Sequence, residues 1–241
     1  MVSLTNYLPD RIRQNIRHPW YAIKVAAQNL FTSFSRHFLG SYSQHGEDII
    51  FVLLLKGLKK GFYVDVGAND PEIISNTKYF YDRGWNGINI EPHPTLFEKI
   101  CSLRERDTNI NAGVAQEETS LKFYQVNEVA GTAGSTFDPE VAKELERKGY
   151  KISKVVEMPV IPLYKILDEK LSGQKIDFMS VDTEGFDLEV LKSNDWSKYR
   201  PKFVLVETVN KNKENIYSFM EKQGYKAIFE NTANTIFKDQ Q

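Results

Sequence analysis

Short apolar runs alternate along most of the chain with segments whose apolar residues recur at helical spacing. The spacing predicts helices between the runs, and strands separated by such helices form a mainly parallel sheet with helices on both faces. Two further runs, 225–229 and 235–237, are predicted to close the sheet as an antiparallel pair. The sequence therefore predicts an α/β fold. The other predicted strands are 62–66, 87–91, 109–114, 175–182 and 203–207, and the helices are 44–56, 75–83, 94–105, 166–171, 186–192 and 214–223.

The alternation pauses after a predicted extra strand at 121–126. A small, polar stretch leads to Asp138, which suits the N-cap of a charged helix at 139–148 that Gly149 would end. An extended segment at 155–161 then returns to the regular pattern. We predict a lid-like insert at about 127–158 within a main domain that spans residues 41–241. A rigid decoration or a dimer contact is the alternative.

The first forty residues differ from the rest in charge. They hold five basic residues and one acidic residue, which gives a net charge of +4, whereas the whole chain carries −1. The remaining residues therefore carry −5. Apolar and aromatic residues recur at helical spacing in this segment, with Pro19 suited to open a helix. We predict that residues 1–40 are a basic amphipathic helical segment. It either packs on the main domain or contacts an anionic membrane or a lipid-linked substrate.

Composition narrows the class of protein only a little. With 241 residues, 41% hydrophobic and 26% charged, the chain is typical of a soluble globular protein. The net charge gives no reason to expect nucleic-acid binding. The single cysteine, Cys101, fits a reducing compartment, and no apolar run is long enough to span a bilayer. We expect a cytoplasmic protein, peripheral at a membrane if residues 1–40 bind lipid.

Candidate chemistry begins at the end of the first main-domain strand, at residues 62–70. In parallel sheets, ligands bind beyond the carboxyl ends of the strands. Here Asp65 ends a buried strand, and Gly67 allows a tight turn with close ligand approach. A dinucleotide site would need G-x-G-x-x-G, but only Gly67 is present and Pro71 interrupts the chain. The pattern favours a cofactor with an amino-acid tail and no phosphate cradle, while an ordinary strand-end turn stays open.

The next strand ends in a second carboxylate, Glu91, 24 residues after Gly67. A carboxylate at this position can accept hydrogen bonds from both hydroxyls of a ribose. A helix-capping or surface role fits less well, because Pro92 follows directly. Position and spacing together therefore favour an adenosine-type cofactor.

Several motifs, in order, resemble those of the FkbM-type methyltransferase family, from about Tyr42 to Asn210. One departure is Asp187, where the family more often has glutamate, and we leave it out of the site. Residues 1–40 lie outside the resemblance. The matching motifs are Ser43-Gln-His-Gly-Glu-Asp48, Asp65-Val-Gly-Ala-Asn-Asp-Pro71, Ser75-Asn-Thr77, Gly84-Trp-Asn-Gly-Ile-Asn-Ile-Glu-Pro92, Ser135-Thr-Phe137, Asp182-Thr-Glu-Gly-Phe-Asp187 and the strand ending at Glu207.

The resemblance implies a Rossmann-like methyltransferase sheet that binds S-adenosylmethionine and methylates a hydroxyl, often on a sugar. It implies that Gly67 and Asn69 lie by the methionine part of the cofactor and that Glu91 holds the ribose. Residues 113–116 would line adenine through backbone groups. The predicted cofactor-binding residues are Gln44, Glu47, Asp65, Gly67, Asn69, Glu91, Val114 and Ala115.

Two further carboxylates, Asp182 and Glu184, are our candidate catalytic residues. Methyl transfer to a hydroxyl requires alignment of donor and acceptor and a group that takes the proton. Asp182 ends a strand beside the expected crevice, and Glu184 follows in a turn relaxed by Gly185. A capping network for the next helix is the alternative. We predict no metal site, although these carboxylates and Glu207 offer the oxygen ligands that Mg²⁺ or Mn²⁺ prefers.

The sequence thus predicts an S-adenosylmethionine-dependent O-methyltransferase. Its partner would be a small-molecule or glycan acceptor and not a nucleic acid, with a homo-oligomer left open. Two alternatives remain: an NAD-linked oxidoreductase, and a non-catalytic accessory subunit that binds the cofactor.

Overall fold

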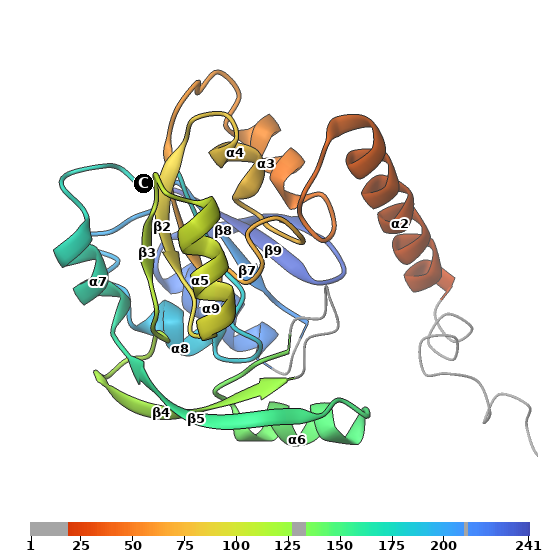
Figure 1. Ribbon diagram of the computed structural model, residues 1–241. Helices are drawn as coiled ribbons and strands as arrows, with labels where there is room; N and C mark the ends of the chain where they lie inside the picture. Colours follow the sequence, from red (N-terminus) through yellow and green to blue (C-terminus); the bar gives the residue numbers. More distant parts are fainter. Residues whose placement is uncertain (1–18, 127–133, 210–211) are drawn as a thin grey trace, which may run out of the picture.

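One seven-stranded sheet forms the centre of the molecule (Figure 1). The computed structural model describes residues 19–126, 134–209 and 212–241. The strand order is β3-β2-β1-β6-β7-β9-β8, and β9 runs antiparallel to both of its neighbours while the other pairs are parallel. The predicted α/β fold with its closing antiparallel pair is confirmed. The strands are β1 (Phe62–Val66), β2 (Asn86–Ile90), β3 (Thr108–Ile110), β6 (Phe178–Val181), β7 (Phe203–Glu207), β8 (Tyr225–Glu230) and β9 (Asn234–Asp239).

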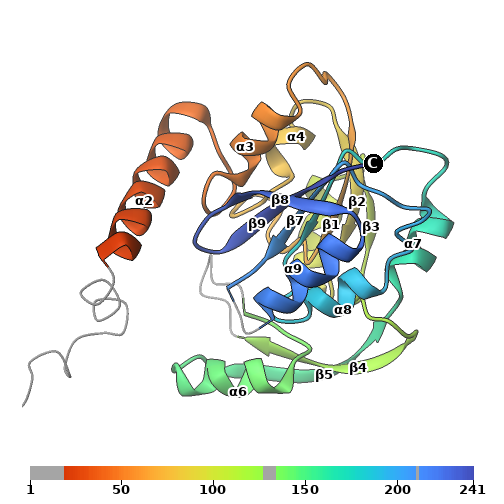
Figure 2. The ribbon, with the colours of Figure 1, turned by 180° about the vertical axis from the view of Figure 1, so that it is seen from behind.

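Helices cover both faces of the sheet (Figures 1 and 2). Successive side chains of a strand point to opposite faces, so Val64 and Tyr63 belong to different apolar clusters. On the Val64 face the cluster includes α7 (Leu163–Lys170), α8 (Asp187–Lys192) and α9 (Lys213–Lys222). On the Tyr63 face it includes α3 (Glu47–Leu54) and α4 (Lys78–Tyr81), and α5 (Pro94–Leu103) lies beside β3. Because both faces are buried, the central strands are mostly apolar, as their sequences indicate, with polar exceptions such as Asp65, Asn89 and Ser180.

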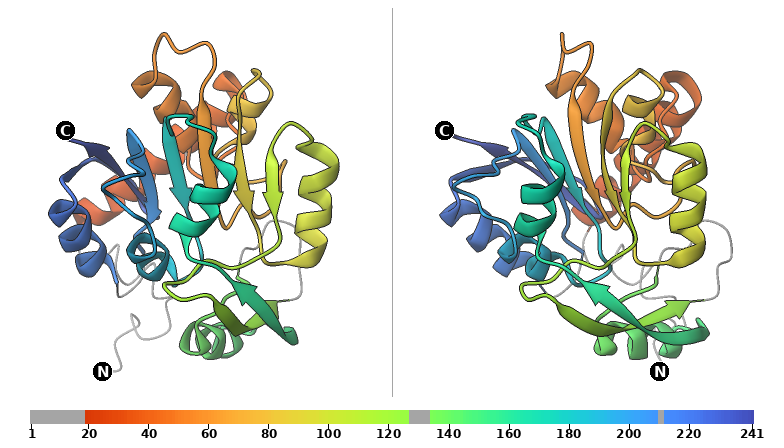
Figure 3. Two further views of the ribbon diagram at one scale, coloured as in Figure 1. Left: turned by 90° about the vertical axis from the view of Figure 1, so that its left-hand side faces the viewer. Right: turned by 60° about the vertical axis from the view of Figure 1, so that its left-hand side comes forward.

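The insert predicted at about 127–158 lies within a larger unit, an antiparallel hairpin with a helix between its strands, and residues 119–126 and 134–160 together form the insert in the structure. Strands β4 (Thr119–Val126) and β5 (Ile152–Val160) pair with each other, and α6 (Pro139–Arg147) lies between them in the chain. Asp138 caps α6 as predicted, since its carboxylate accepts hydrogen bonds from the N–H groups of Glu140 and Val141. Figure 3 shows the hairpin and α6 lying across the carboxyl ends of the parallel strands. Most of the small polar stretch predicted before Asp138 lies outside the described residues.

Several predicted elements are shorter in the structure, among them the strand predicted at 175–182, which spans only Phe178–Val181. The helix predicted at 44–56 starts only at Glu47, because Gly46 has a φ of +86° that a helix cannot contain. The helix predicted at 75–83 starts at Lys78, since the Ser75 hydroxyl accepts the N–H of that residue and competes with helical bonding. The strand predicted at 109–114 ends at Ile110, and the chain beyond it turns to pair with the insert.

A long helix, α2 (Pro19–Leu39), lies beside the main domain and opens at Pro19 as predicted. Its contacts are with the loop before α3, where Gln28 donates a hydrogen bond to the carbonyl of His45. Residues 1–18 lie outside the described part of the chain. Among the helices of residues 19–126, 134–209 and 212–241, none combines the length and apolar character needed to cross a membrane.

Candidate active site

The site lies where the chain order of the strands reverses, between β1 and β6. The N–H of Asp182, just after β6, donates a hydrogen bond of 3.0 Å to the carbonyl of Val66 at the end of β1. A Cβ placed on Gly67 would lie 1.9 Å from the carbonyl oxygen of Asp182. Gly67, whose φ is +79°, is therefore required both by its backbone angle and by the close approach of the two strand ends.

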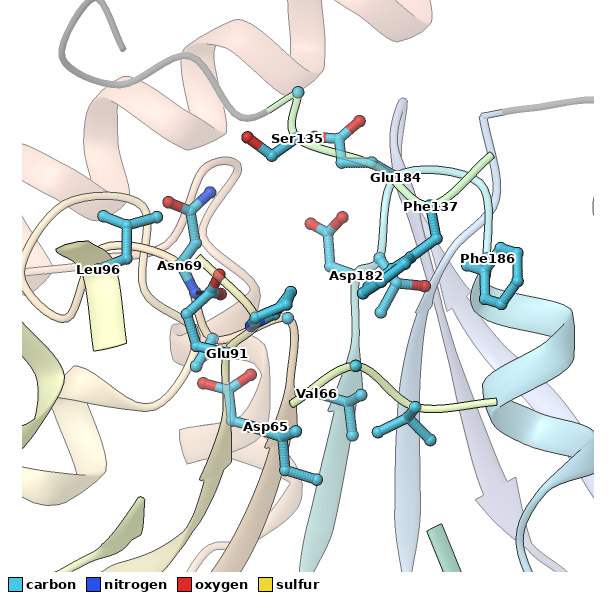
Figure 4. Close-up of a pocket in the computed structure, with 18 of the residues that line it drawn as sticks. Asp65, Val66, Asn69, Glu91, Leu96, Ser135, Phe137, Asp182, Glu184 and Phe186 are labelled. Carbon is cyan, nitrogen blue, oxygen red and sulfur yellow. Dashed lines mark hydrogen bonds between the residues drawn. The ribbon is translucent and has the colours of Figure 1, made fainter. Parts of the chain in front are cut away.

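A cavity of about 310 Å³ opens at this switch point. Figure 4 shows Asn69, Glu91 and Leu96 on one side and Asp182, Phe137 and Phe186 on the other. On the side away from the sheet, residues of the insert line the cavity. Six of the predicted cofactor residues and both predicted catalytic residues line it: Gln44, Asp65, Gly67, Asn69, Glu91, Val114, Asp182 and Glu184.

Glu91 is almost fully buried and held by backbone donors on both carboxylate oxygens. Oε2 accepts the N–H of Asn69 and Oε1 accepts the N–H of His93, both at 2.8 Å. Asn69 has a φ of +52°, a conformation that asparagine adopts more readily than most residues. The carboxylate is thus fixed in orientation at the edge of the cavity. Each carboxylate oxygen has two acceptor positions, so this geometry is compatible with binding two neighbouring hydroxyls.

Asp65 also borders the cavity, but its carboxylate is tied into the protein. It accepts a hydrogen bond of 2.8 Å from the Thr77 hydroxyl and one from Ser180 on the neighbouring strand. Burial raises the pKa of Asp65 to about 6. In the same segment, Asn76 Nδ2 donates a hydrogen bond of 3.1 Å to the Ser180 hydroxyl. These bonds fix the loop after β1 against β6.

Glu47 and Ala115 lie outside the residues that line the cavity. The Glu47 carboxylate is fully buried, and Oε1 accepts from Nδ2 of Asn231 at 2.8 Å and of Asn234 at 2.7 Å. Its Oε2 accepts the N–H of His45 at 2.8 Å. Glu47 therefore anchors the loop that carries Gln44 to the turn between β8 and β9. Its placement is that of a positioning residue.

The segment around Val114 joins the sheet to the insert. Gly113 donates its N–H to the carbonyl of Pro159 at 2.9 Å and accepts the N–H of Ile161 at 3.1 Å. Val114 lines the cavity, whereas Ala115 is buried in the apolar cluster of the insert. The wall near Val114 is apolar, with Leu96 of α5 on the same side as Glu91 (Figure 4).

Three carboxylates border the other side of the cavity: Asp182, Glu184 and Glu207. None of the three accepts a hydrogen bond or joins an ion pair within the described part of the chain. Burial and then the charge of Asp187 raise the pKa of Glu184 to about 7, and burial and then the charges of Asp182 and Glu184 raise that of Glu207 to about 10. The pKa of Asp182 is raised in the same way, first by burial and then by the charge of Glu184.

Asp187, which we left out of the site, holds the turn that carries Glu184. Its Oδ1 accepts the N–H of Thr183 at 2.8 Å and its Oδ2 accepts the N–H of Gly185 at 3.3 Å. Glu184 itself has a φ of +52°, which these bonds help to maintain. The spacing of Asp187 after a Gly-containing turn is the sequence signal for this role.

An aromatic wall was not predicted, apart from Phe137 in the insert. Phe123 and Phe137 have ring centroids 4.7 Å apart, and Phe137 and Phe186 are 5.9 Å apart. All three line the cavity, and Tyr150 joins them near its mouth. They come from distant parts of the chain, so only the fold brings them together.

The described residues contain no group of three or more histidine, cysteine, aspartate or glutamate side chains arranged to hold a metal ion. Lysine, arginine and histidine are also missing from the described residues that line the cavity. The charged lining groups there are carboxylates.

Comparisons with known proteins give one family match and a number of similar solved structures. The sequence model of the methyltransferase FkbM domain matches residues 65–227. Among solved structures, methyltransferase FkbM from Methylobacillus flagellatus is 14% identical, with a TM-score of 0.46, over 91% of this chain and 60% of that one. The 1,6-didemethyltoxoflavin-N1-methyltransferase of Burkholderia thailandensis is 9% identical, with a TM-score of 0.42, over 93% and 90% of the two chains.

This chain spans 60% of the length of the Methylobacillus protein. The search of curated proteins found no significant match. The family match covers well over half of the chain, including the ends of β1, β2, β6 and β7 that form the site. The predicted family is confirmed: the chain belongs to the FkbM methyltransferase family.

Proposed function

We propose that this protein is an S-adenosylmethionine-dependent O-methyltransferase that acts on a hydroxyl of a sugar or glycoconjugate. The observation that carries the proposal is the arrangement of Glu91 and Asp182 on two sides of one cavity at the switch point of the sheet. The family supports methyl transfer, and the sugar hydroxyl is our inference from the resemblance.

The residues on the Glu91 side fit the cofactor. A tight turn at Gly67 and a fixed carboxylate suit an adenosine with an amino-acid tail, and no glycine nest for phosphates is needed. Glu91 would accept from the ribose hydroxyls, Val114 would pack beside adenine, and Gln44 and Asn69 would lie by the methionine part. When bound, S-adenosylmethionine supplies a methyl group that its positive sulfur activates for displacement.

The carboxylates on the opposite side suit the acceptor. Asp182 would orient the hydroxyl, and a carboxylate of the Asp182–Glu184 pair would take its proton as the oxygen–methyl bond forms and the carbon–sulfur bond breaks. The bonding electrons of that carbon–sulfur bond go to sulfur. A raised pKa near the working pH makes a carboxylate a more effective proton acceptor, and Glu184 has a pKa of about 7.

We propose that the insert contributes to acceptor binding. Ser135, Phe137 and Tyr150 reach the cavity from it, and Glu184 lies beside Ser135 in Figure 4. The Thr136 hydroxyl donates to the carbonyl of Glu184 at 2.8 Å, which links the insert to the turn that carries the catalytic pair. Movement of the insert would therefore change the position of Glu184.

The test is methyl transfer by Asp182→Asn, measured with labelled S-adenosylmethionine and a panel of glycan hydroxyl acceptors. We expect turnover to fall by about 10²–10⁴-fold while cofactor affinity stays within a few-fold of wild type. Asp195→Asn is the matched control, because Asp195 is exposed and bonds only to neighbours in its own turn. Full turnover by Asp182→Asn would refute the catalytic assignment.

Two other outcomes would support the alternatives. Binding of NAD in place of S-adenosylmethionine would indicate an oxidoreductase. Tight cofactor binding without transfer to any hydroxyl in the panel would favour a non-catalytic accessory subunit.

A further inference from the structure

Helix α2 carries an apolar stripe that faces away from the rest of the protein. Ile23, Leu30, Phe34 and Phe38 are 57%, 73%, 48% and 77% exposed. Their spacing of seven, four and four residues places them on one face of the helix. The rings of Phe34 and Phe38 stack with their centroids 5.2 Å apart.

The opposite face of α2, which touches the main domain, carries polar side chains together with Phe31, whose ring lies against Gly46. Gln28 Nε2 donates to the carbonyl of His45 at 3.0 Å, and Arg36 donates to the carbonyl of Ser43 at 3.4 Å. Ser35 is fully buried, and a Cβ placed on Gly46 would lie 2.8 Å from its hydroxyl oxygen. Figures 1 and 2 show α2 extending from the body with only one side turned toward it.

This orientation leaves exposed the apolar stripe that a packed accessory helix would bury. A helix that packs on a domain normally buries its apolar stripe and exposes its polar face. Docking on this domain therefore does not explain why four large apolar side chains recur on one face. The stripe fits a surface outside the described chain.

Charge indicates which surface. Helix α2 has Lys24 and Arg36 but no aspartate or glutamate, and the first forty residues carry +4 against −5 for the rest. An anionic lipid surface attracts such a segment, and an apolar face with aromatic rings inserts at the level of the headgroups. A second copy would instead bring two segments of the same positive charge together.

We propose that α2 lies in the plane of an anionic lipid bilayer, with Ile23, Leu30, Phe34 and Phe38 inserted and the main domain held at the membrane surface. The helix touches the 43–46 loop, which contains the cavity residue Gln44, so the active site would be tethered close to lipid. This membrane contact is more specific than the one predicted from the sequence, because it names the inserted side chains. It does not depend on methyl transfer, because lipid binding is measured without cofactor or acceptor.

The experiment is flotation of the full chain with vesicles of phosphatidylcholine alone and of phosphatidylcholine mixed with phosphatidylglycerol. We expect binding to the anionic vesicles only, weakened by salt, and a loss of at least about tenfold in the Phe34→Glu/Phe38→Glu variant. Both residues are exposed, so this variant should fold, which circular dichroism checks. Leu58→Glu/Leu103→Glu is the matched control: these side chains are 44% and 41% exposed outside α2, and we expect it to bind like wild type.

Three results would overturn the proposal. Equal flotation of wild type and Phe34→Glu/Phe38→Glu would show that the stripe is not the lipid contact. A concentration-dependent dimer in analytical ultracentrifugation that this variant abolishes, without vesicle binding by wild type, would assign the stripe to a second copy. Vesicle binding that Phe34→Glu/Phe38→Glu retains and that deletion of residues 1–18 abolishes would assign the lipid contact to residues 1–18.

Discussion

The two sides of the cavity use carboxylates in opposite ways. On the Glu91 side, both carboxylate oxygens are bonded to backbone N–H groups, and Asp65 is bonded to Thr77 and Ser180. On the Asp182 side, Asp182, Glu184 and Glu207 have no bonding partner among the residues that the structure describes, and neighbouring carboxylates help to raise the pKa of each.

The difference indicates separate roles. Groups held by backbone donors keep one geometry, which suits a cofactor that is the same in every turnover. Buried carboxylates that repel each other destabilise the fold, and such groups cluster at functional sites. The Asp182 side is therefore arranged for a ligand that supplies the missing donors.

Substitution of Gly67 by alanine should have the largest effect, because Gly67 lies where the two sides meet. The new Cβ would be 1.9 Å from the backbone oxygen of Asp182, and φ is already +79°. We expect Gly67→Ala to lower the free energy of unfolding by at least about 3 kcal/mol and to impair cofactor binding. Chemical denaturation and titration calorimetry measure the two effects.

Gly57→Ala is the matched control. Gly57 has a φ of +95° but nothing within 4 Å of its added Cβ, so only backbone strain remains. We expect a loss of about 1 kcal/mol there. If the two alanine variants were equally stable, the close approach of the strand ends would not matter.

Replacement of Glu207 by glutamine should stabilise the protein. The pKa of Glu207 is about 10 in the fold and near 4.5 in an unfolded chain, so the unfolded state releases its proton first as pH rises. This carboxyl group therefore lowers stability progressively between about pH 4.5 and 10, and it has no such effect below that window. We expect Glu207→Gln to raise the free energy of unfolding by about 2 kcal/mol at pH 8 and by almost nothing at pH 4.

Asp70→Asn tests a carboxylate on the Glu91 side of the cavity. We expect it to lower the free energy of unfolding, by less than Glu207→Gln raises it. Burial opposes ionisation of Asp70, but Lys99 and the N–H groups of Glu72 and Ile73 outweigh it and lower the pKa of Asp70. Its stabilisation is present above the unfolded pKa and is lost as pH falls through the lower folded value. We expect a loss below about 1 kcal/mol at pH 8. A stabilised Asp70→Asn or a destabilised Glu207→Gln in thermal melts would contradict the comparison.

The sequence predicted the strands well, and three residues expected on the Glu91 side, Gly67, Asn69 and Glu91, line one cavity. Phe62–Val66 and Phe203–Glu207 have the predicted limits, because both are runs that are apolar except for one carboxylate each, Asp65 and Glu207. Each of the three cavity residues follows the end of one strand: Gly67 and Asn69 come after β1, and Glu91 comes after β2. The carboxyl ends of neighbouring parallel strands meet at the same edge of the sheet. Local pattern and topology were enough for these residues.

Long-range contacts set what the sequence did not predict. Glu47 bonds to Asn231 and Asn234, more than 180 positions away, and no spacing rule connects them. The aromatic wall joins Phe123, Phe137 and Phe186 from two parts of the insert and the turn before α8. The apolar stripe of α2 is exposed and does not face the main domain, since periodicity locates a stripe but not the surface that it meets.

The assignment of Glu91 to an adenosine cofactor is tested most directly by titration calorimetry, with S-adenosylhomocysteine and NAD each titrated into wild type and into Glu91→Ala. The account predicts that wild type binds S-adenosylhomocysteine and not NAD, and that Glu91→Ala weakens this binding by about 10–100-fold while Asp182→Asn leaves it nearly unchanged. Unchanged affinity in Glu91→Ala, or tight binding of NAD by wild type, would contradict the assignment of the Glu91 side to an adenosine cofactor without phosphates.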